Sequence, residues 1–207
     1  MKQIYKNFEI EVFDDLQFTL NLADNLRQYE KVYFNEKDLE TKFSPASKHA
    51  IIIKEFETKI SSAFIYESGW TVKINEKSFI IKDDKIWIIA GNKVYCLSIP
   101  SLDLKWQKEF DNFTNIAIYK IENDFLIHGE LEIFRITKEG QILWRFGGRD
   151  IWVNTEGKPE FNIENDTIRL FDFESNEYVI DFNGNQIEDN PRIVSQEIKK
   201  KWWKIFG

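Results

Sequence analysis

His128, Glu130 and Glu132 form the densest group of metal-ligating residue types in the chain. Alternate residues of a β-strand share one face, so in a strand these side chains could together bind a cation. A competing interpretation is an exposed edge strand whose charges discourage pairing with other sheets. The chain has one other histidine, His49, and neither histidine lies in a known ligand motif. We therefore expect no metal site and keep Glu130 only as a candidate binding residue.

A second group, Gly147-Gly148-Arg149-Asp150, would place a cation beside a carboxylate on a tight turn. Residues on such loops often carry function. Alternatively, the glycines only turn the chain, and Arg149 and Asp150 pair with each other or cap the turn. The Lys-Ser/Thr ending of a phosphate-binding loop is missing. Arg149 and Asp150 are therefore candidate binding residues and not part of a nucleotide site.

Catalytic chemistry has little support in the sequence. Two histidines are present and no Gly-x-Ser-x-Gly motif occurs. Cys96 lies in an apolar stretch, where a cysteine is usually a small buried hydrophobe. The 35 Asp and Glu residues make chance carboxylate pairs common. We expect no catalytic residue and no cofactor, and we favour a binding protein over an enzyme.

The end of the sequence combines lysines with two neighbouring tryptophans, Trp202 and Trp203. Apolar side chains recur at helical spacing, which predicts an amphipathic helix over residues 191–207: Val194, Ile198, Trp202 and Ile205. This helix could bind a partner or a membrane interface, or it could close the end of a β-structure. We favour closure, because burying an aromatic side chain stabilises a fold by about 2–3 kcal/mol. Trp202 and Trp203 remain candidate binding residues.

The composition indicates a globular chain rich in β-strands. Aromatic residues make up 15% of the 207 residues, hydrophobic residues 43% and charged residues 30%. A net charge of −7 disfavours nucleic acid as a partner. The single cysteine excludes an intrachain disulfide, and the N-terminus does not resemble a signal peptide. No apolar run approaches the roughly 18 residues of a membrane span, so we expect a cytoplasmic protein without membrane association.

Alternating apolar residues predict strands along most of the chain. Residues 8–12 and 16–22 are typical of a β-hairpin. Residues 23–34 are ambiguous between a short helix and a strand, and residues 35–47 predict a loop. Further short strands are expected at residues 51–53, 60–66, 70–74 and 79–81.

From residue 86 the pattern repeats. An apolar run ends at the turn Gly91-Asn92, and the returning strands lead to Trp106. The same layout recurs with Gly129 and Trp144, and both pairs of landmarks are 38 positions apart. Residues 180–184 repeat 136–140 more weakly, at an offset of 44. A period of about 40 residues is typical of β-propeller blades.

The stretches 94–106 and 133–144 resemble the blade repeat of quinoprotein-type and WD-like β-propellers, over about residues 86–190. The first copy departs from that repeat at Pro100-Ser101 and lacks a turn glycine. Five blades at most fit in this length, so the fold we expect is mainly β: antiparallel strand meanders stacked as a partial or small β-propeller-like domain. We expect one domain over 1–207, with an N-terminal hairpin and loop, repeated meanders and a C-terminal helix: residues 1–47, 48–190 and 191–207.

Residues 127–151 are similar to stretches in uncharacterised bacterial proteins, some thought to be immunity partners of secreted toxins. We expect a non-enzymatic protein-interaction module whose partner is another protein, and toxin neutralisation is one concrete form of this function. The alternative is a small-ligand or saccharide-binding protein, or a hydrolase, with a cleft lined by Trp70, Trp87 and Trp152.

Overall fold

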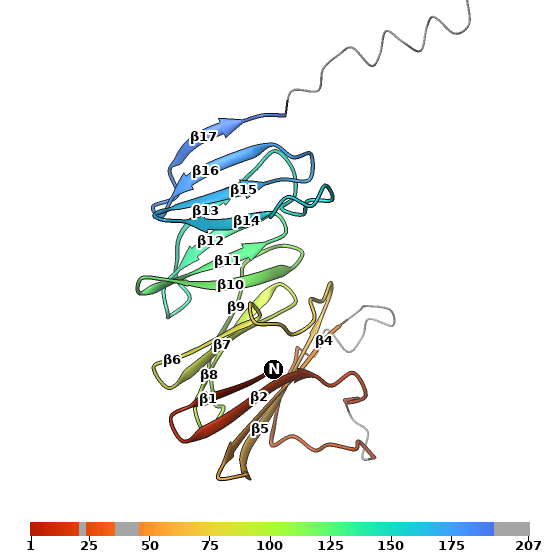
Figure 1. The fold of residues 1–207 in the computed structure, drawn as a ribbon. Helices are drawn as coiled ribbons and strands as arrows, with labels where there is room; N and C mark the ends of the chain where they lie inside the picture. Colours follow the sequence, from red (N-terminus) through yellow and green to blue (C-terminus); the bar gives the residue numbers. More distant parts are fainter. Residues whose placement is uncertain (21–23, 36–45, 193–207) are drawn as a thin grey trace, which may run out of the picture. The chain divides into compact units, whose positions relative to one another are not determined.

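The chain divides into two compact units in the computed structural model, Met1–Gly147 and Gly148–Gly207. The structure describes residues 1–20, 24–35 and 46–192. These residues form seventeen strands in four sheets (Figure 1), and they contain no helix, hence none that could cross a bilayer. The expectation of a mainly β chain is confirmed. The C-terminal helix expected over 191–207 falls almost entirely outside the described residues.

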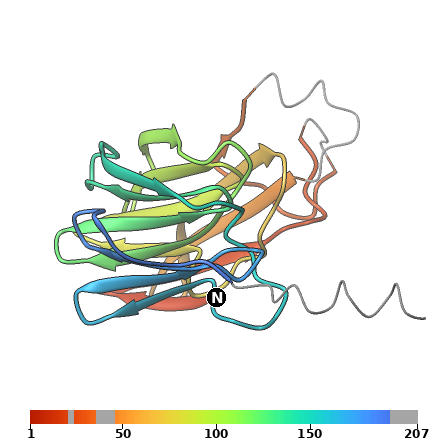
Figure 2. The ribbon, with the colours of Figure 1, turned by 90° about the horizontal axis from the view of Figure 1, so that it is seen from above.

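The first sheet has five strands in the order β1-β2-β4-β5-β3. Their bounds are β1 Lys2–Tyr5, β2 Phe8–Asp14, β3 Lys31–Tyr33, β4 Ala46–Glu55 and β5 Thr58–Ser68. All pairs are antiparallel except β3 with β5. The segment that follows β2 covers one face of this sheet, where Phe18 packs on Ala50 and Phe64; Figure 2 shows the segment beside β4 and β5.

The other three sheets are four-stranded antiparallel meanders in which consecutive strands pair. The second sheet contains β6 Phe79–Lys82, β7 Lys85–Ala90, β8 Lys93–Ser98 and β9 Leu104–Glu109. The third contains β10 Asn115–Ile121, β11 Asp124–Gly129, β12 Glu132–Ile136 and β13 Ile142–Gly147. The fourth, in the second unit, contains β14 Phe161–Glu164, β15 Thr167–Phe171, β16 Glu177–Asp181 and β17 Gln186–Asn190.

Two expectations for the first 80 residues are wrong, and a third, which left two alternatives open, is decided in favour of the strand. The strand expected over residues 16–22 does not form in its described part, residues 16–20, and β2 instead pairs with β1 through a turn at which Lys6 takes a φ of 54°. Phe18 instead leaves the sheet plane to cover its face. The ambiguous segment forms no helix in residues 24–34 and contributes β3. Residues 70–74 form no strand, because Gly69, with a φ of 107°, ends β5 and turns the chain into a loop.

The strand pairing confirms the tryptophan landmarks of the repeat, but the two glycines are not at equivalent positions: Gly91 lies in the turn after β7, and Gly129 is the last residue of β11. Trp106 pairs with Cys96, and Trp144 pairs with Arg135, each directly beside a β-bulge. The fourth sheet has the same bulge, and Glu188 occupies the position of these tryptophans. The three meanders therefore share one local geometry although their side chains differ.

An apolar layer joins the second and third sheets. The rings of Trp87 and Phe125 lie 4.8 Å apart within it. The indole N–H groups of Trp87 and Trp106 both donate to the carbonyl oxygen of Lys138, at 3.1 Å. The side chains of one sheet thus bind the β12–β13 turn of the next, which fixes how the two sheets stack.

The two repeated glycines are required for different reasons. Gly91 takes a φ of 55° in the two-residue turn between β7 and β8, where a left-handed conformation favours glycine. Gly129 has no positive φ. A Cβ at Gly129 would lie 2.4 Å from Oδ2 of Asp111 and 2.7 Å from the carbonyl oxygen of Glu132. Glycine is needed there because a carboxylate approaches the backbone.

Gly129→Ala therefore should lower the free energy of unfolding by about 1–3 kcal/mol, the usual cost of overpacking a buried site. Urea denaturation measures this change. Gly147→Ala is the matched control, because its nearest neighbouring atom would lie 3.7 Å away. Equal stability of the two variants would contradict this explanation of Gly129.

Candidate functional site

The structure separates the group His128, Glu130 and Glu132. The chain reverses at Glu130 and Leu131, so His128 lies in β11, which ends at Gly129, while Glu132 begins β12. The expectation that the three share one strand face is wrong, and so is the edge-strand alternative, because β11 lies between β10 and β12. Over the described ranges, no group of three or more His, Cys, Asp or Glu residues is arranged to hold a metal ion.

Asp111 organises this reversal and was not singled out by the sequence. Its Oδ2 accepts the N–H groups of Leu131 (2.8 Å) and Glu132 (3.1 Å), and its Oδ1 accepts the N–H of Phe113 at 2.8 Å. Asp111 as a whole residue is 1% exposed. It therefore joins the β9–β10 connection to the β11–β12 turn. The glycine at 129 was the only sequence signal for this contact.

Thr114 ties three connections together. Its hydroxyl lies within hydrogen-bond distance of the carbonyl oxygens of Trp70 (3.3 Å) and Gly91 (3.4 Å). Its own carbonyl accepts the N–H of Glu130 at 2.9 Å. We call the connections 69–78, 91–92, 110–114 and 130–131 the loop end of the first unit. These hydrogen bonds hold the loop end as one surface.

A buried ion pair lies within the first unit, next to the Gly91 turn. Lys93 donates to both carboxylate oxygens of Glu67, at 2.9 and 2.8 Å, and the hydroxyl of Tyr95 donates to the same carboxylate. The hydroxyl of Ser47 accepts the N–H of Gly91 at 2.9 Å. Because Glu67 is buried, its charge is compensated by these donors instead of by water.

The side chain of Asn115 contains buried polar atoms that these hydrogen bonds do not satisfy. Its side-chain Nδ2 and Oδ1 are both buried and have no hydrogen-bond partner in the described structure. A buried polar group left unpaired costs about 1–3 kcal/mol. Native proteins retain few such groups, and they often occur where function constrains the residue. Asn115 directly follows the Thr114 connection, which places this cost at the loop end.

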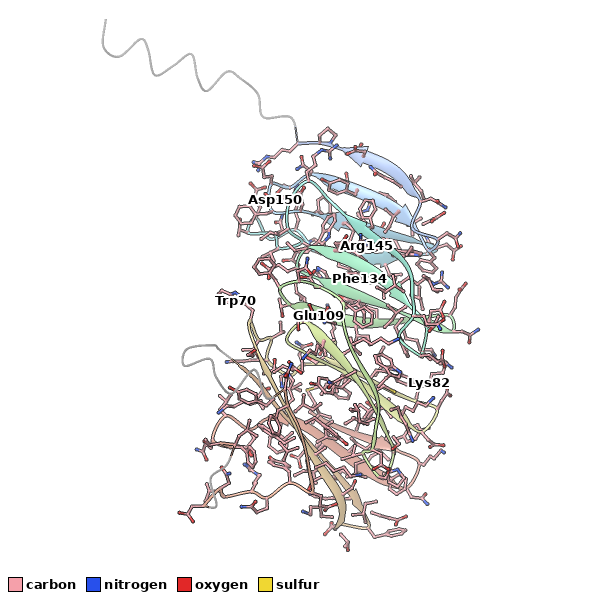
Figure 3. All side chains as sticks on the ribbon, turned by 180° about the vertical axis from the view of Figure 1, so that it is seen from behind. Trp70, Lys82, Glu109, Phe134, Arg145 and Asp150 are labelled. Carbon is pink, nitrogen blue, oxygen red and sulfur yellow. The ribbon has the colours of Figure 1, made fainter. Side chains whose placement is uncertain are left out.

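Two aromatic side chains project from the loop end. Trp70 is 66% exposed and Phe113 is 54% exposed. Figure 3 shows Trp70 on the loop after β5. Trp70 and Phe113 come from connections that Thr114 and Asp111 hold in place. The arrangement is suited to binding, because anchored aromatic residues bury a large area at a low cost in conformational entropy.

Burial, together with the nearby charge of Asp111, raises the pKa of Glu130 above its ordinary value. Glu130 belongs to the loop end as defined above, and the sequence predicted it as a candidate binding residue. Its carboxyl is placed where a partner that approaches the loop end would desolvate it further.

Arg149 and Asp150 lie in the second unit and do not pair with each other. Arg149 forms a two-fold ion pair with Asp189, at 2.7 and 2.6 Å, and stacks over the ring of Tyr178 at 5.3 Å. Oδ1 of Asp150 accepts the N–H of Ile151 at 2.8 Å. Both residues thus have local structural partners, and they lie in a different unit from Glu130.

The tryptophan-lined cleft is not formed by the residues expected to line it. Trp87 and Trp152 are completely buried, and only Trp70 is exposed. Trp202 and Trp203 lie outside the described residues. Cys96 is buried as expected, and burial raises the pKa of its thiol to about 11, which removes it as a nucleophile at neutral pH.

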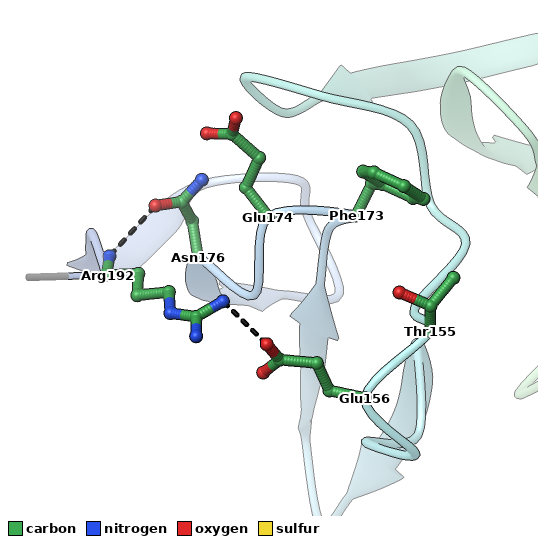
Figure 4. A pocket seen from close by; sticks show the side chains of 6 residues that line it. All are labelled: Thr155, Glu156, Phe173, Glu174, Asn176 and Arg192. Carbon is green, nitrogen blue, oxygen red and sulfur yellow. Dashed lines mark hydrogen bonds and ion pairs between the residues drawn. The ribbon is translucent and has the colours of Figure 1, made fainter. Parts of the chain in front are cut away.

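The second unit contains a surface hollow of about 320 Å³ (Figure 4). Six side chains line it: Thr155, Glu156, Phe173, Glu174, Asn176 and Arg192. Arg192 crosses its rim, with an ion pair to Glu156 at 2.7 Å and a backbone N–H that donates to Asn176 at 2.9 Å. Hydrogen bonds from Ser175 and Arg192 lower the pKa of Glu156. The hollow is polar and anionic.

No protein-family model matches this sequence, and no curated protein matches it. Solved structures resemble parts of it. The match with BamB from Moraxella catarrhalis covers 70% of this chain and 45% of BamB, with 15% identity and a TM-score of 0.46. The match with the computationally designed Ika8 protein covers 74% of this chain and 49% of Ika8, with 9% identity and a TM-score of 0.46. The match with a europium-containing methanol dehydrogenase covers 54% of this chain and 24% of the dehydrogenase, with 15% identity and a TM-score of 0.42.

BamB and the methanol dehydrogenase have β-propeller-type folds. This chain spans less than half the length of each of the three matched proteins. All three TM-scores lie below 0.5, so the fold is defined by the strand pairing of the chain itself.

The raised pKa of Glu130 predicts a pH-dependent stability. Below the ordinary value of 4.5, the carboxyl is protonated in the folded and unfolded chains and adds nothing. As pH rises from 4.5 through the raised pKa, the unfolded chain ionises first, so the folded state loses relative stability. Glu130→Gln cannot ionise and should gain stability over the wild type across this window, levelling off above it.

Urea denaturation at a series of pH values from about 4 to 8 measures the effect. Glu109→Gln removes a carboxyl from an exposed position of β9 and is the control for the loss of one charge. A stability gain for Glu130→Gln that is the same at every pH would argue against a buried, charge-sensitive carboxyl.

Proposed function

We propose that this chain is a protein-interaction module that binds another protein through the loop end of its first unit. The observation that carries the proposal is the exposure of Trp70 and Phe113 on connections fixed by buried hydrogen bonds. Large exposed aromatics on rigid loops are typical of binding hot spots. Pre-ordered loops lose little conformational entropy on association, which leaves more of the contact energy for affinity.

The concrete form that we favour is neutralisation of a basic protein. The net charge of −7 would steer a cationic partner toward this chain, and the rate of association would fall as salt increases. Glu130 adds a carboxyl beside the aromatic anchors. A toxin-neutralising role is one example of this form.

We also infer that the four-stranded sheets are blades of a partial β-propeller. The support is that all three share one connectivity and one bulge position. In this architecture, the connections at one end of the blades form a common surface, and that is where the loop end lies in the first unit.

The experiment is affinity capture from the native host with the immobilised full-length chain, followed by mass spectrometry. Trp70→Ala and Phe113→Ala should each weaken capture of a specific protein by about ten-fold or more, the effect of losing a hot-spot residue. Leu143→Ala removes a similarly exposed apolar residue from β13, away from the loop end, and should bind as the wild type does.

Retention of the same proteins by all four chains, or of none by the wild type, would reject binding through the loop end. Urea denaturation of each variant establishes that it is folded. Since both aromatic side chains are largely exposed, we expect their loss to change stability by about 0.5 kcal/mol or less.

A further inference from the structure

Charge is unevenly distributed within the second unit. Residues 148–192 contain 11 acidic and 4 basic residues, a net charge of −7, whereas residues 193–207 contain four lysines and one glutamate, a net charge of +3. The basic segment also carries three aromatic residues: Trp202, Trp203 and Phe206. An acidic surface and a basic, aromatic segment are therefore joined in one chain.

The hollow lined by Glu156 and Glu174 is the place on this surface that best fits such a segment. Glu174 is exposed and forms no ion pair with any residue that the structure describes. Phe173, the preceding residue, also lines the hollow and is 45% exposed, so the hollow offers an aromatic side chain as well as a carboxylate (Figure 4). Lysines and tryptophans are the side chains that complement these two groups.

The chain enters the basic segment at the rim of the hollow. Arg192, the last described residue, is held there by Glu156 and Asn176. The segment is therefore tethered within a few residues of its complement. Tethering converts binding into an intramolecular event with an effective concentration of about millimolar, so even weak contacts are populated.

We propose that residues 193–207 dock on this hollow, with their lysines facing Glu174 and an aromatic side chain packed on Phe173. Docking covers the exposed phenylalanine and neutralises part of the acidic surface. The hollow is then a binding site occupied by a segment of the same chain. Salt weakens this docking, because ion pairs at an exposed surface weaken as the screening length falls. This site differs from the loop end and does not depend on the function proposed above.

Limited trypsin digestion of the full-length protein tests the proposal, with intact mass used to follow cleavage after Lys199, Lys200, Lys201 and Lys204. A docked segment is cut slowly. Glu174→Gln and Phe173→Ala should each accelerate removal of the segment by about three-fold or more, as should about 1 M salt, where the screening length is about 3 Å. Rates are normalised to cleavage of a free peptide under the same conditions.

Two matched variants serve as controls. Asp166→Asn makes the same charge change at the opposite end of β15, and Ile187→Ala removes an exposed apolar residue from β17. Both should be cut at the wild-type rate. Equal cleavage rates for the wild type, Glu174→Gln and Phe173→Ala would overturn the proposal, as would equal acceleration by the control variants.

Two further arms distinguish other occupants. Protection that increases with protein concentration would assign the hollow to the segment of a second copy and overturn docking within one chain. Protection found only on addition of vesicles containing phosphatidylserine, and equal in the wild type and Glu174→Gln, would assign the segment to a membrane surface and equally reject the proposal.

Discussion

The loop end of the first unit depends on one buried carboxylate. Asp111 accepts three backbone N–H groups from two connections, and Gly129 leaves the space that its approach requires. Phe113 and Leu131 lie outside the strands, so without the carboxylate their N–H groups would lose this acceptor. The contact thus converts two loops that are distant in sequence into one surface, and the exposure of Phe113 follows from it.

The sheets beneath this surface are subject to a packing constraint. The second sheet has buried apolar residues on both faces, such as Ile88 on one and Trp87 on the other, so it has to be covered on both sides. The second and third sheets share one apolar layer, while the segment that contains Phe18 covers the face of the first sheet. Trp87 and Trp106 add directed hydrogen bonds to Lys138, which fix the stacking that apolar contact alone would leave adjustable.

The sequence predicted the strands on both sides of Gly91 and Gly140 well, because alternation and turn glycines act locally, but it did not single out β10, β14 or β15. It failed where tertiary contacts decided the outcome. Phe18 has the alternation of a strand but covers a face, and Glu130 has the spacing of a shared face but lies in a turn. Asp111 could not be identified, since nothing in its neighbouring residues records the turn it would bind. Of the sequence candidates, Glu130 lies in the loop end, whereas Arg149 and Asp150 have partners of their own in the second unit.

Amide hydrogen exchange at Leu131 and Glu132 tests the role of Asp111 most directly. If the carboxylate holds the turn, both amides should exchange as slowly as those in the interior of β11, and Asp111→Ala should make them, together with that of Phe113, exchange at the rate of an open loop. Fast exchange of both amides in the wild-type protein would contradict the account.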